Sequence, residues 1–288
     1  MTMRLKVVHT TTFEYDGTAN ASYNQARLTP RTTPEQIVLH TRLDVSPAPW
    51  THSYRDYFGT QVTTFEVFDP HESLTVSATS TVQTNRSPAP GPQLSWADLA
   101  SPEVVDARTE YLLTGPMVAP PADLAQRARE LAADAASPGE AAKAMCALVH
   151  DEVDYITGST SVQSHAADAW VQRGGVCQDM AHLVIGGLRT MGIPARYVSG
   201  YLHPASVPVV GESVAGESHA WVQWWDDGWQ AWDIANDVEP LDRHVVIAAG
   251  RDYTDVKPLS GIFTGGGTSD MTVDVQVTCL YSSALEPS

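Results

Sequence analysis

Apolar and polar residues alternate through the first 86 residues of the chain, which is the pattern of half-buried β-strands. The clearest run is 72–84, where Leu74, Val76, Ala78 and Val82 share one face. Residues 60–68 add the β-branched and aromatic content typical of strands. With similar runs at 4–15 and 36–45, the pattern predicts an all-β, sandwich-like domain over residues 1–86.

The pattern changes after a linker at 87–97, where proline and glycine disfavour regular structure. Helical periodicity follows at 101–113, 121–136 and 137–153. The third of these opens with Ser137 and Glu140, a capping box. We therefore predict that a helical segment opens a second domain, residues 98–288.

The last third returns to strands, at 195–202, 218–225 and 228–234. They are apolar on both faces, as expected for a sheet that is covered on both sides. A final alternating strand is expected at 272–281. The chain as a whole is thus predicted to be α+β.

Composition narrows the class of protein. The 288 residues are 43% hydrophobic and 18% charged, and no apolar run approaches the roughly 20 residues that span a bilayer. A net charge of −17 argues against nucleic acid or an anionic membrane as partner. The N-terminus is typical of a strand and not of a signal peptide, and three widely spaced cysteines make a disulfide framework improbable. We expect a cytoplasmic protein, and composition leaves its oligomeric state open.

Cys177 follows two glycines, Gly174 and Gly175, that permit a tight turn. Apolar positions from Met180 onward then predict a helix that ends at Gly192. The free amides and the dipole at a helix N-terminus favour a thiolate and can stabilise an oxyanion. A cysteine that only packs beneath the turn would give the same pattern, so this stretch alone leaves both interpretations open. Two further cysteines, Cys146 and Cys279, lie among apolar residues and are predicted to be packed core thiols.

A thiol nucleophile needs a general base, and the base needs an orienting group. His219 lies in a predicted buried strand that a turn at 226–228 joins to the strand carrying Asp233. A three-residue loop with Gly228 in the left-handed position pairs residue 225 with 229 and brings His219 and Asp233 to one face. A two-residue loop would put Asp233 on the opposite face. A triad of Cys177, His219 and Asp233 therefore requires the register of the three-residue loop.

Other candidates have competing interpretations. Asp179 and His182 share a helix face near Cys177 and could support the site or bind a metal, but a satisfied buried polar pair is favoured. With His219 they could form a zinc hydrolase site, which would leave the order of the cysteine, histidine and aspartate unexplained. Tyr155, Gln163 and Ser164 precede the helix, and any of them could supply a second oxyanion donor. Trp221 could line a cleft, although most tryptophans here should be core residues.

An ordered set of motifs resembles the transglutaminase-like superfamily, in its bacterial branch that is labelled as cysteine proteases and carries an N-terminal β domain. The motifs are Gly175-Val176-Cys177-Gln178-Asp179, Ala181-His182, GIPARYVSGYL at 192–202, His219-Ala220-Trp221-Val222, Trp232-Asp233 and GRDYTDVKPLSGIF at 250–263. The family often has Asp-Pro-Thr-Asn where this chain has Asp233-Ile234-Ala235-Asn236. The aspartate is retained, while the local backbone and pocket shape should differ.

The resemblance implies a papain-like core in which the cysteine helix packs on an antiparallel sheet. It assigns Cys177, His219 and Asp233 as nucleophile, general base and orienting acid of acyl transfer through a thioester. The substrate would be a protein, a peptide or a small amide, and no cofactor or metal would be needed. Water as acceptor gives an amidase or protease, and an amine gives a transglutaminase. The competing possibilities are a catalytically silent binding module and, less favoured, the zinc hydrolase.

Overall fold

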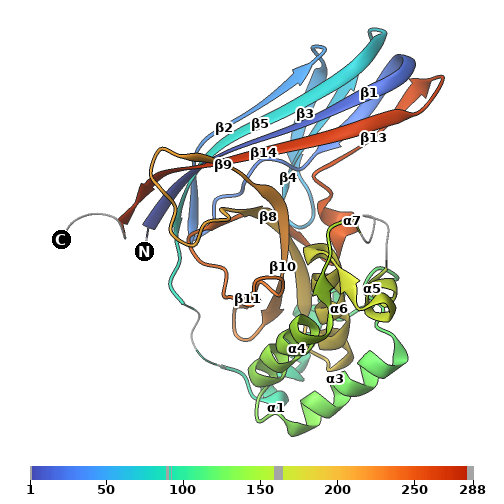
Figure 1. Cartoon of the computed structure of the whole chain (residues 1–288). Coiled ribbons are helices and arrows are strands. Elements are labelled where there is room, and N and C mark those ends of the chain that lie inside the picture. The colour runs from blue at the N-terminus through green and yellow to red at the C-terminus, as the bar shows by residue number, and fades with distance from the viewer. Residues whose placement is uncertain (1, 89–90, 92, 159–164, 284–288) are drawn as a thin grey trace.

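The computed structural model describes residues 2–88, 91, 93–158 and 165–283 of the chain. It contains a large sheet of eight strands, a second sheet of four strands, and a group of helices packed on the second sheet (Figure 1). The predicted α+β class is confirmed. None of the helices in these ranges is long and apolar enough to cross a membrane.

The first sheet is built around one long strand, β1 (Thr2–Ala26). Its first half pairs antiparallel with β5 (His71–Asn85) on one side and β14 (Ser269–Ser282) on the other. The outer strands are β2 (Gln36–Ser46), which pairs with β5, and the short β9 (Ser213–Ala215), which pairs with β14.

The sheet folds over into two layers because β1 bends. Its pairing with β5 is interrupted between Glu14 and Ala19, and Gly17 within the interruption has a φ of 113°. The second half of β1 then pairs with β13 (Leu259–Gly265) and β4 (Gln61–Val67), and β3 (Trp50–Arg55) extends β4. Leu74 of β5 and Phe65 of β4 are fully buried in one cluster between the layers. The predicted sandwich-like domain is therefore present.

The last two strands differ from the predicted domain division. Residues 98–288 were expected to form the second domain, but β13 and β14 are hydrogen-bonded to β1 of the first sheet. The alternation at 272–281 predicted the strand itself. It could not predict the partner, because strand pairing across the whole length of the chain leaves no local signal.

The second sheet has the order β11 (Trp229–Trp232), β10 (Glu217–Trp225), β8 (Ala195–Leu202) and β12 (His244–Gly250). The helices are α1 (Trp96–Leu99), α2 (Pro102–Ala107), α3 (Ala122–Asp134), α4 (Pro138–Glu152), α5 (Ala166–Gln172), α6 (Cys177–Thr190) and α7 (Tyr253–Val256), with a 3-10 turn at Thr109–Tyr111. A short parallel pair, β6 (Asp154–Tyr155) and β7 (Gly174–Gly175), leads into α6.

Helix α6 lies at the centre of the second domain, between the sheet and the other helices (Figure 1). All of its residues from Gln178 to Arg189 are buried. A single hydrophobic cluster extends from Leu5 of β1 through Leu183 of α6 to Val222 of β10. The two domains therefore share one core, and the position of α6 is fixed from all sides.

Candidate active site

Cys177 is the first residue of α6 and is partly exposed. The turn before it is held by Asp179, whose Oδ2 accepts a hydrogen bond from the backbone N–H of Val176 at 2.9 Å. A Cβ placed on Gly175 would lie 2.8 Å from the Cβ of Asp179, which explains the glycine at this position. The sequence prediction of a cysteine at the entrance of a helix is confirmed, as is the burial of the other two cysteines.

The hairpin that carries His219 has the predicted register. Trp225 pairs with Trp229, so the loop between β10 and β11 has three residues. The left-handed residue of this loop is Asp227, with a φ of 57°, and not Gly228 as expected, whose φ is 158°. The register is the same in either case, and it puts Asp233 on the face of His219.

The side chains of Asp233 and His219 are hydrogen-bonded to each other. Oδ2 of the fully buried Asp233 lies 2.7 Å from Nε2 of His219, which leaves Nδ1 of the ring for Cys177, a residue that borders the same cavity. Burial alone would lower the pKa of His219, but hydrogen bonds and charge from Asp233 and Cys177 outweigh it and raise that pKa to about 10. Burial would raise the pKa of Asp233, yet its histidine partners hold it well below its usual range.

Two further residues bind the same carboxylate and were not predicted. Oδ2 of Asp233 also accepts from Nε2 of His244, at 3.0 Å, and from Nδ2 of Asn236, at 2.8 Å. Burial lowers the pKa of His244, which makes this ring a neutral donor through Nε2. His244 opens an apolar strand on the far side of β8, so its sequence context gave no sign of this contact. Asn236 lies three residues after Asp233, and the sequence pattern there does not indicate that its side chain contacts the aspartate.

Tyr155 and Trp221 lie on different sides of His219. Tyr155 borders the larger cavity beside His219, and burial together with the charges of Cys177 and Glu217 raises the pKa of Tyr155 to about 12. Trp221 is 1% exposed, and its ring centroid lies 5.4 Å from that of His244 in an edge-to-face contact. Trp221 therefore packs behind the two histidines and does not border the cavities that meet at His219.

Asp179 and His182 are both buried and have different partners. Asp179 caps α6, whereas Nε2 of His182 accepts the backbone N–H of Tyr253 at 3.2 Å. Burial lowers the pKa of His182 to about 4, so this ring is neutral. Gln163 and Ser164 lie outside the described residues. Within the described ranges, the three potential metal ligands that lie close together are His219, Asp233 and His244, with ligand atoms within 4.8 Å of one another, and not Asp179 with His182.

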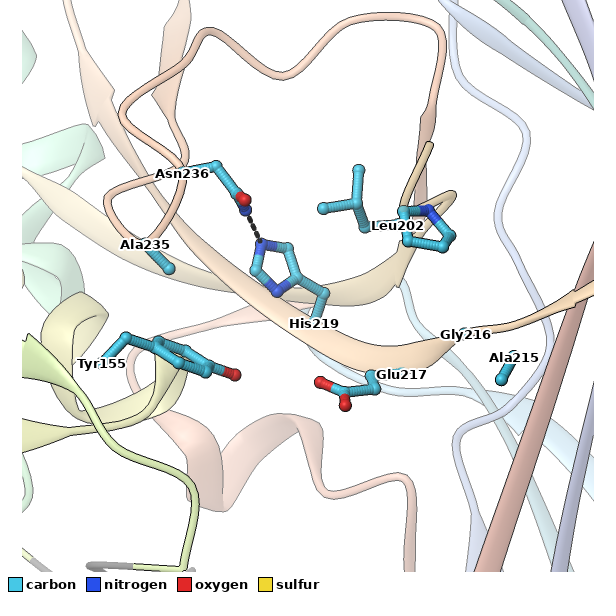
Figure 2. A pocket seen from close by; sticks show the side chains of 9 residues that line it. Tyr155, Leu202, Ala215, Gly216, Glu217, His219, Ala235 and Asn236 are labelled. Atoms are coloured by element: carbon cyan, nitrogen blue, oxygen red, sulfur yellow. Dashed lines mark hydrogen bonds between the residues drawn. The ribbon is translucent and has the colours of Figure 1, made fainter. Parts of the chain in front are cut away.

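Two cavities meet at His219. One of about 440 Å³ is bordered by Tyr155, Glu217 and Asn236. Figure 2 shows the imidazole of His219 between Asn236 on one side and Tyr155 and Glu217 on the other. The second cavity, of about 270 Å³, contains Cys177 in its wall. A substrate can therefore approach the sulfur from one cavity while the histidine remains accessible from the other.

The chain matches two family models over these same regions. Residues 5–83 match the bacterial transglutaminase-like N-terminal region, and residues 125–234 match the transglutaminase-like superfamily. The second match covers α6, the β10–β11 hairpin and Asp233. The chain belongs to the transglutaminase-like superfamily.

The chain is also similar along most of its length to mycobacterial proteins and to a solved structure. An uncharacterized protein of Mycobacterium leprae is 43% identical over 96% of this chain and 99% of its own length. An uncharacterized protein of Mycobacterium tuberculosis is 32% identical over 99% of this chain and 95% of its own. A crystal structure from Cytophaga hutchinsonii, described as a "Putative Cysteine Protease", superposes with a TM-score of 0.77 at 23% identity, covering 98% of this chain and 92% of that one. At this identity the last likeness concerns the fold.

Proposed function

We propose that this protein is a cysteine-dependent enzyme that transfers an acyl group from an amide, with Cys177 as nucleophile, His219 as general base and Asp233 as orienting acid. The observation that carries the proposal is the 2.7 Å hydrogen bond between Asp233 and His219, together with the cavity whose wall His219 shares with Cys177 at the N-terminus of α6. Such an arrangement, in which a base activates a nucleophile and is itself oriented by a third group, defines a triad by geometry.

In the first half of the reaction His219 takes the proton of the Cys177 thiol, and the thiolate attacks the amide carbonyl and forms a C–S bond. Charge that develops on the carbonyl oxygen is stabilised by the backbone N–H groups and the dipole at the start of α6, and we assign the hydroxyl of Tyr155, which borders the neighbouring cavity, as a second donor. The imidazolium of His219 gives its proton to the leaving nitrogen, the C–N bond breaks, and a thioester remains on Cys177.

In the second half His219 removes a proton from the incoming acceptor, which attacks the thioester and restores the thiol. Asp233 keeps the ring in position in both halves, and His244 and Asn236 keep Asp233 in position. Water as acceptor gives hydrolysis and an amine gives transamidation. We favour hydrolysis, because water reaches His219 through the cavity of Figure 2 without a dedicated acceptor site.

Turnover of a glutamine-containing peptide amide, with and without an added primary amine, tests the proposal. Cys177→Ala should abolish turnover and remain folded, because it deletes no large apolar side chain. Cys146→Ala, which removes a buried thiol away from the site, is the matched control and should retain activity. Turnover that survives in Cys177→Ala, or that is lost to a chelator and restored by zinc, would refute the cysteine mechanism.

A further inference from the structure

The cavity that holds Cys177 is not formed by the second domain alone. Its wall includes His9 and Thr11 of β1 and Met271 and Val273 of β14, all from the first sheet (Figure 1). Pro258 and Leu259, where the second layer of the sandwich begins, close a further side. The cavity thus lies at the junction of the two domains, and both contribute side chains to it.

The register of β1 and β14 explains why these side chains point into the cavity. Thr11 pairs with Val273 and Phe13 pairs with Met271, so the side chains of each pair share a face of the sheet. On the same face, Val275 and Val277 are 5% and 1% exposed because they pack on the shared core. Val273 and Met271, which lie two and four residues before Val275, are 50% and 58% exposed. The apolar face therefore continues past its covered part and extends over Cys177.

Polar contacts hold this part of the first sheet over the site. Nδ1 of His9 lies 2.8 Å from the hydroxyl of Tyr201 in β8, and Nε2 of His9 lies 3.0 Å from Oγ1 of Thr11. Burial lowers the pKa of His9 to about 4, so the ring is neutral and donates through one nitrogen and accepts through the other. The wall is thus fixed to the second domain without introducing a charge.

Apart from Cys177 and His219, the lining of this cavity is uncharged. Among the described residues that border this cavity none is Asp, Glu, Lys or Arg, and the non-catalytic part is largely apolar or aromatic. The other cavity differs, since Glu217 lies in its wall. A volume of about 270 Å³ is just below the range of about 300 to 1,000 Å³ that is typical of small-molecule sites, so it suits one side chain of a substrate.

We propose that the first sheet completes the acyl-side pocket, and that Met271 and Val273 select an uncharged, apolar group next to the carbonyl that Cys177 attacks. The inference rests on the proposed function for the attack itself. It gives the β domain a role in choosing the substrate, because burial of an apolar group against these side chains favours it over a charged one.

The test uses alkylation of Cys177, which needs no turnover. Iodoacetamide and N-benzyl iodoacetamide are compared with a carboxylate-bearing iodoacetamide, and labelling of the Cys177 peptide is followed by mass spectrometry. The thiolate displaces iodide from each reagent, so the three differ only in the group that enters the pocket. We expect the benzyl reagent to exceed the carboxylate reagent by about tenfold or more in the wild-type protein.

Met271→Asp and Val273→Asp should reduce that preference toward one. Thr272→Asp lies on the same strand with its side chain on the opposite face, and should leave the preference unchanged. Equal preference in wild type, or an unchanged preference in both pocket variants that still label at Cys177, would overturn the inference. A normal preference in a protein that turns over no amide or ester would instead overturn the proposed function and leave the pocket assignment standing.

Discussion

At the scale of single residues, Oδ2 of Asp233 organises the site. Three donors converge on it, from His219, His244 and Asn236, at 2.7, 3.0 and 2.8 Å. Hydrogen bonds to an ionised acceptor are stronger than neutral ones, and a buried carboxylate without them would be costly. The carboxylate is thus held ionised and in place, and it fixes the imidazole that faces Cys177.

Replacing Asp233 by asparagine tests this role. Asp233→Asn keeps the shape but removes the charge, so His219 loses its main source of stabilisation as an imidazolium and can adopt the wrong tautomer. The analogous change costs about 10⁴ in turnover in serine proteases, and we expect a smaller loss here because a thiol ionises more readily. The exposed Asp237, which accepts from Trp232 Nε1 at 3.1 Å, provides the control Asp237→Asn. Equal turnover in the two variants would show that Asp233 does not orient the base.

At the scale of elements, the features that local rules determine were predicted. A loop of three residues sets the hairpin register, and the apolar run from Met180 onward sets α6. The tight turn expected at Gly174 and Gly175 is not present there, because these glycines form β7 and the left-handed residue is Arg173, with a φ of 53°. The contacts of His244 and the destination of β14 were not predicted, since both depend on pairing between strands far apart in the sequence. Local sequence thus indicated Cys177, His219 and Asp233. The residues that support and enclose these three are brought to them by tertiary structure.

The packing of α6 gives a prediction at this scale. A Cβ on Gly186 would lie 2.0 Å from the backbone oxygen of Val118, whereas one on Gly187 would meet the side-chain end of Met145. A methionine side chain can move and a backbone carbonyl in the core cannot move without cost. We expect Gly186→Ala to lower the free energy of unfolding by about 1 to 3 kcal/mol, and Gly187→Ala to lower it less. Urea unfolding measures both, and the reverse order would contradict the described position of α6.

At the scale of the whole molecule, the first sheet and the second domain act as one body. Beyond the shared core, Gln36 of β2 donates to the carbonyl of Val246 and accepts from its N–H, both at 2.8 Å. His9 and Tyr201 form another link, close to Cys177. A rigid junction of this kind is what a pocket shared between the domains requires.

Buried neutral histidines make the stability of the molecule depend on pH. Burial holds the pKa of His9 and of His182 at about 4, below the value of about 6.5 in an unfolded chain. The unfolded chain therefore binds more protons between these values, so this stability is fully present above pH 6.5 and is lost as the pH falls toward 4. Each site contributes at most roughly 3 kcal/mol to the loss.

Thermal melts between pH 4 and 8 measure this dependence. On the acid side, His9→Gln should reduce the slope of the free energy of unfolding against pH by about the contribution of one proton, because glutamine cannot take up the proton. His40→Gln, which changes an exposed histidine, serves as the control and should follow the wild type. Identical curves for wild type and His9→Gln would contradict a neutral, buried His9.

The central claim is that Cys177 and His219 form a reactive pair, and the rate of iodoacetamide labelling from pH 5.5 to 9 tests it most directly. With the pKa of His219 raised to about 10 by Asp233 and Cys177, against the effect of burial, the imidazolium persists over this range. We predict that Cys177 labels much faster than Cys146 and Cys279 throughout this range, and that His219→Gln slows it because the imidazolium beside the sulfur is lost. Labelling of Cys177 that is no faster than that of Cys146 and Cys279, or that has the same rate in His219→Gln, would contradict the account.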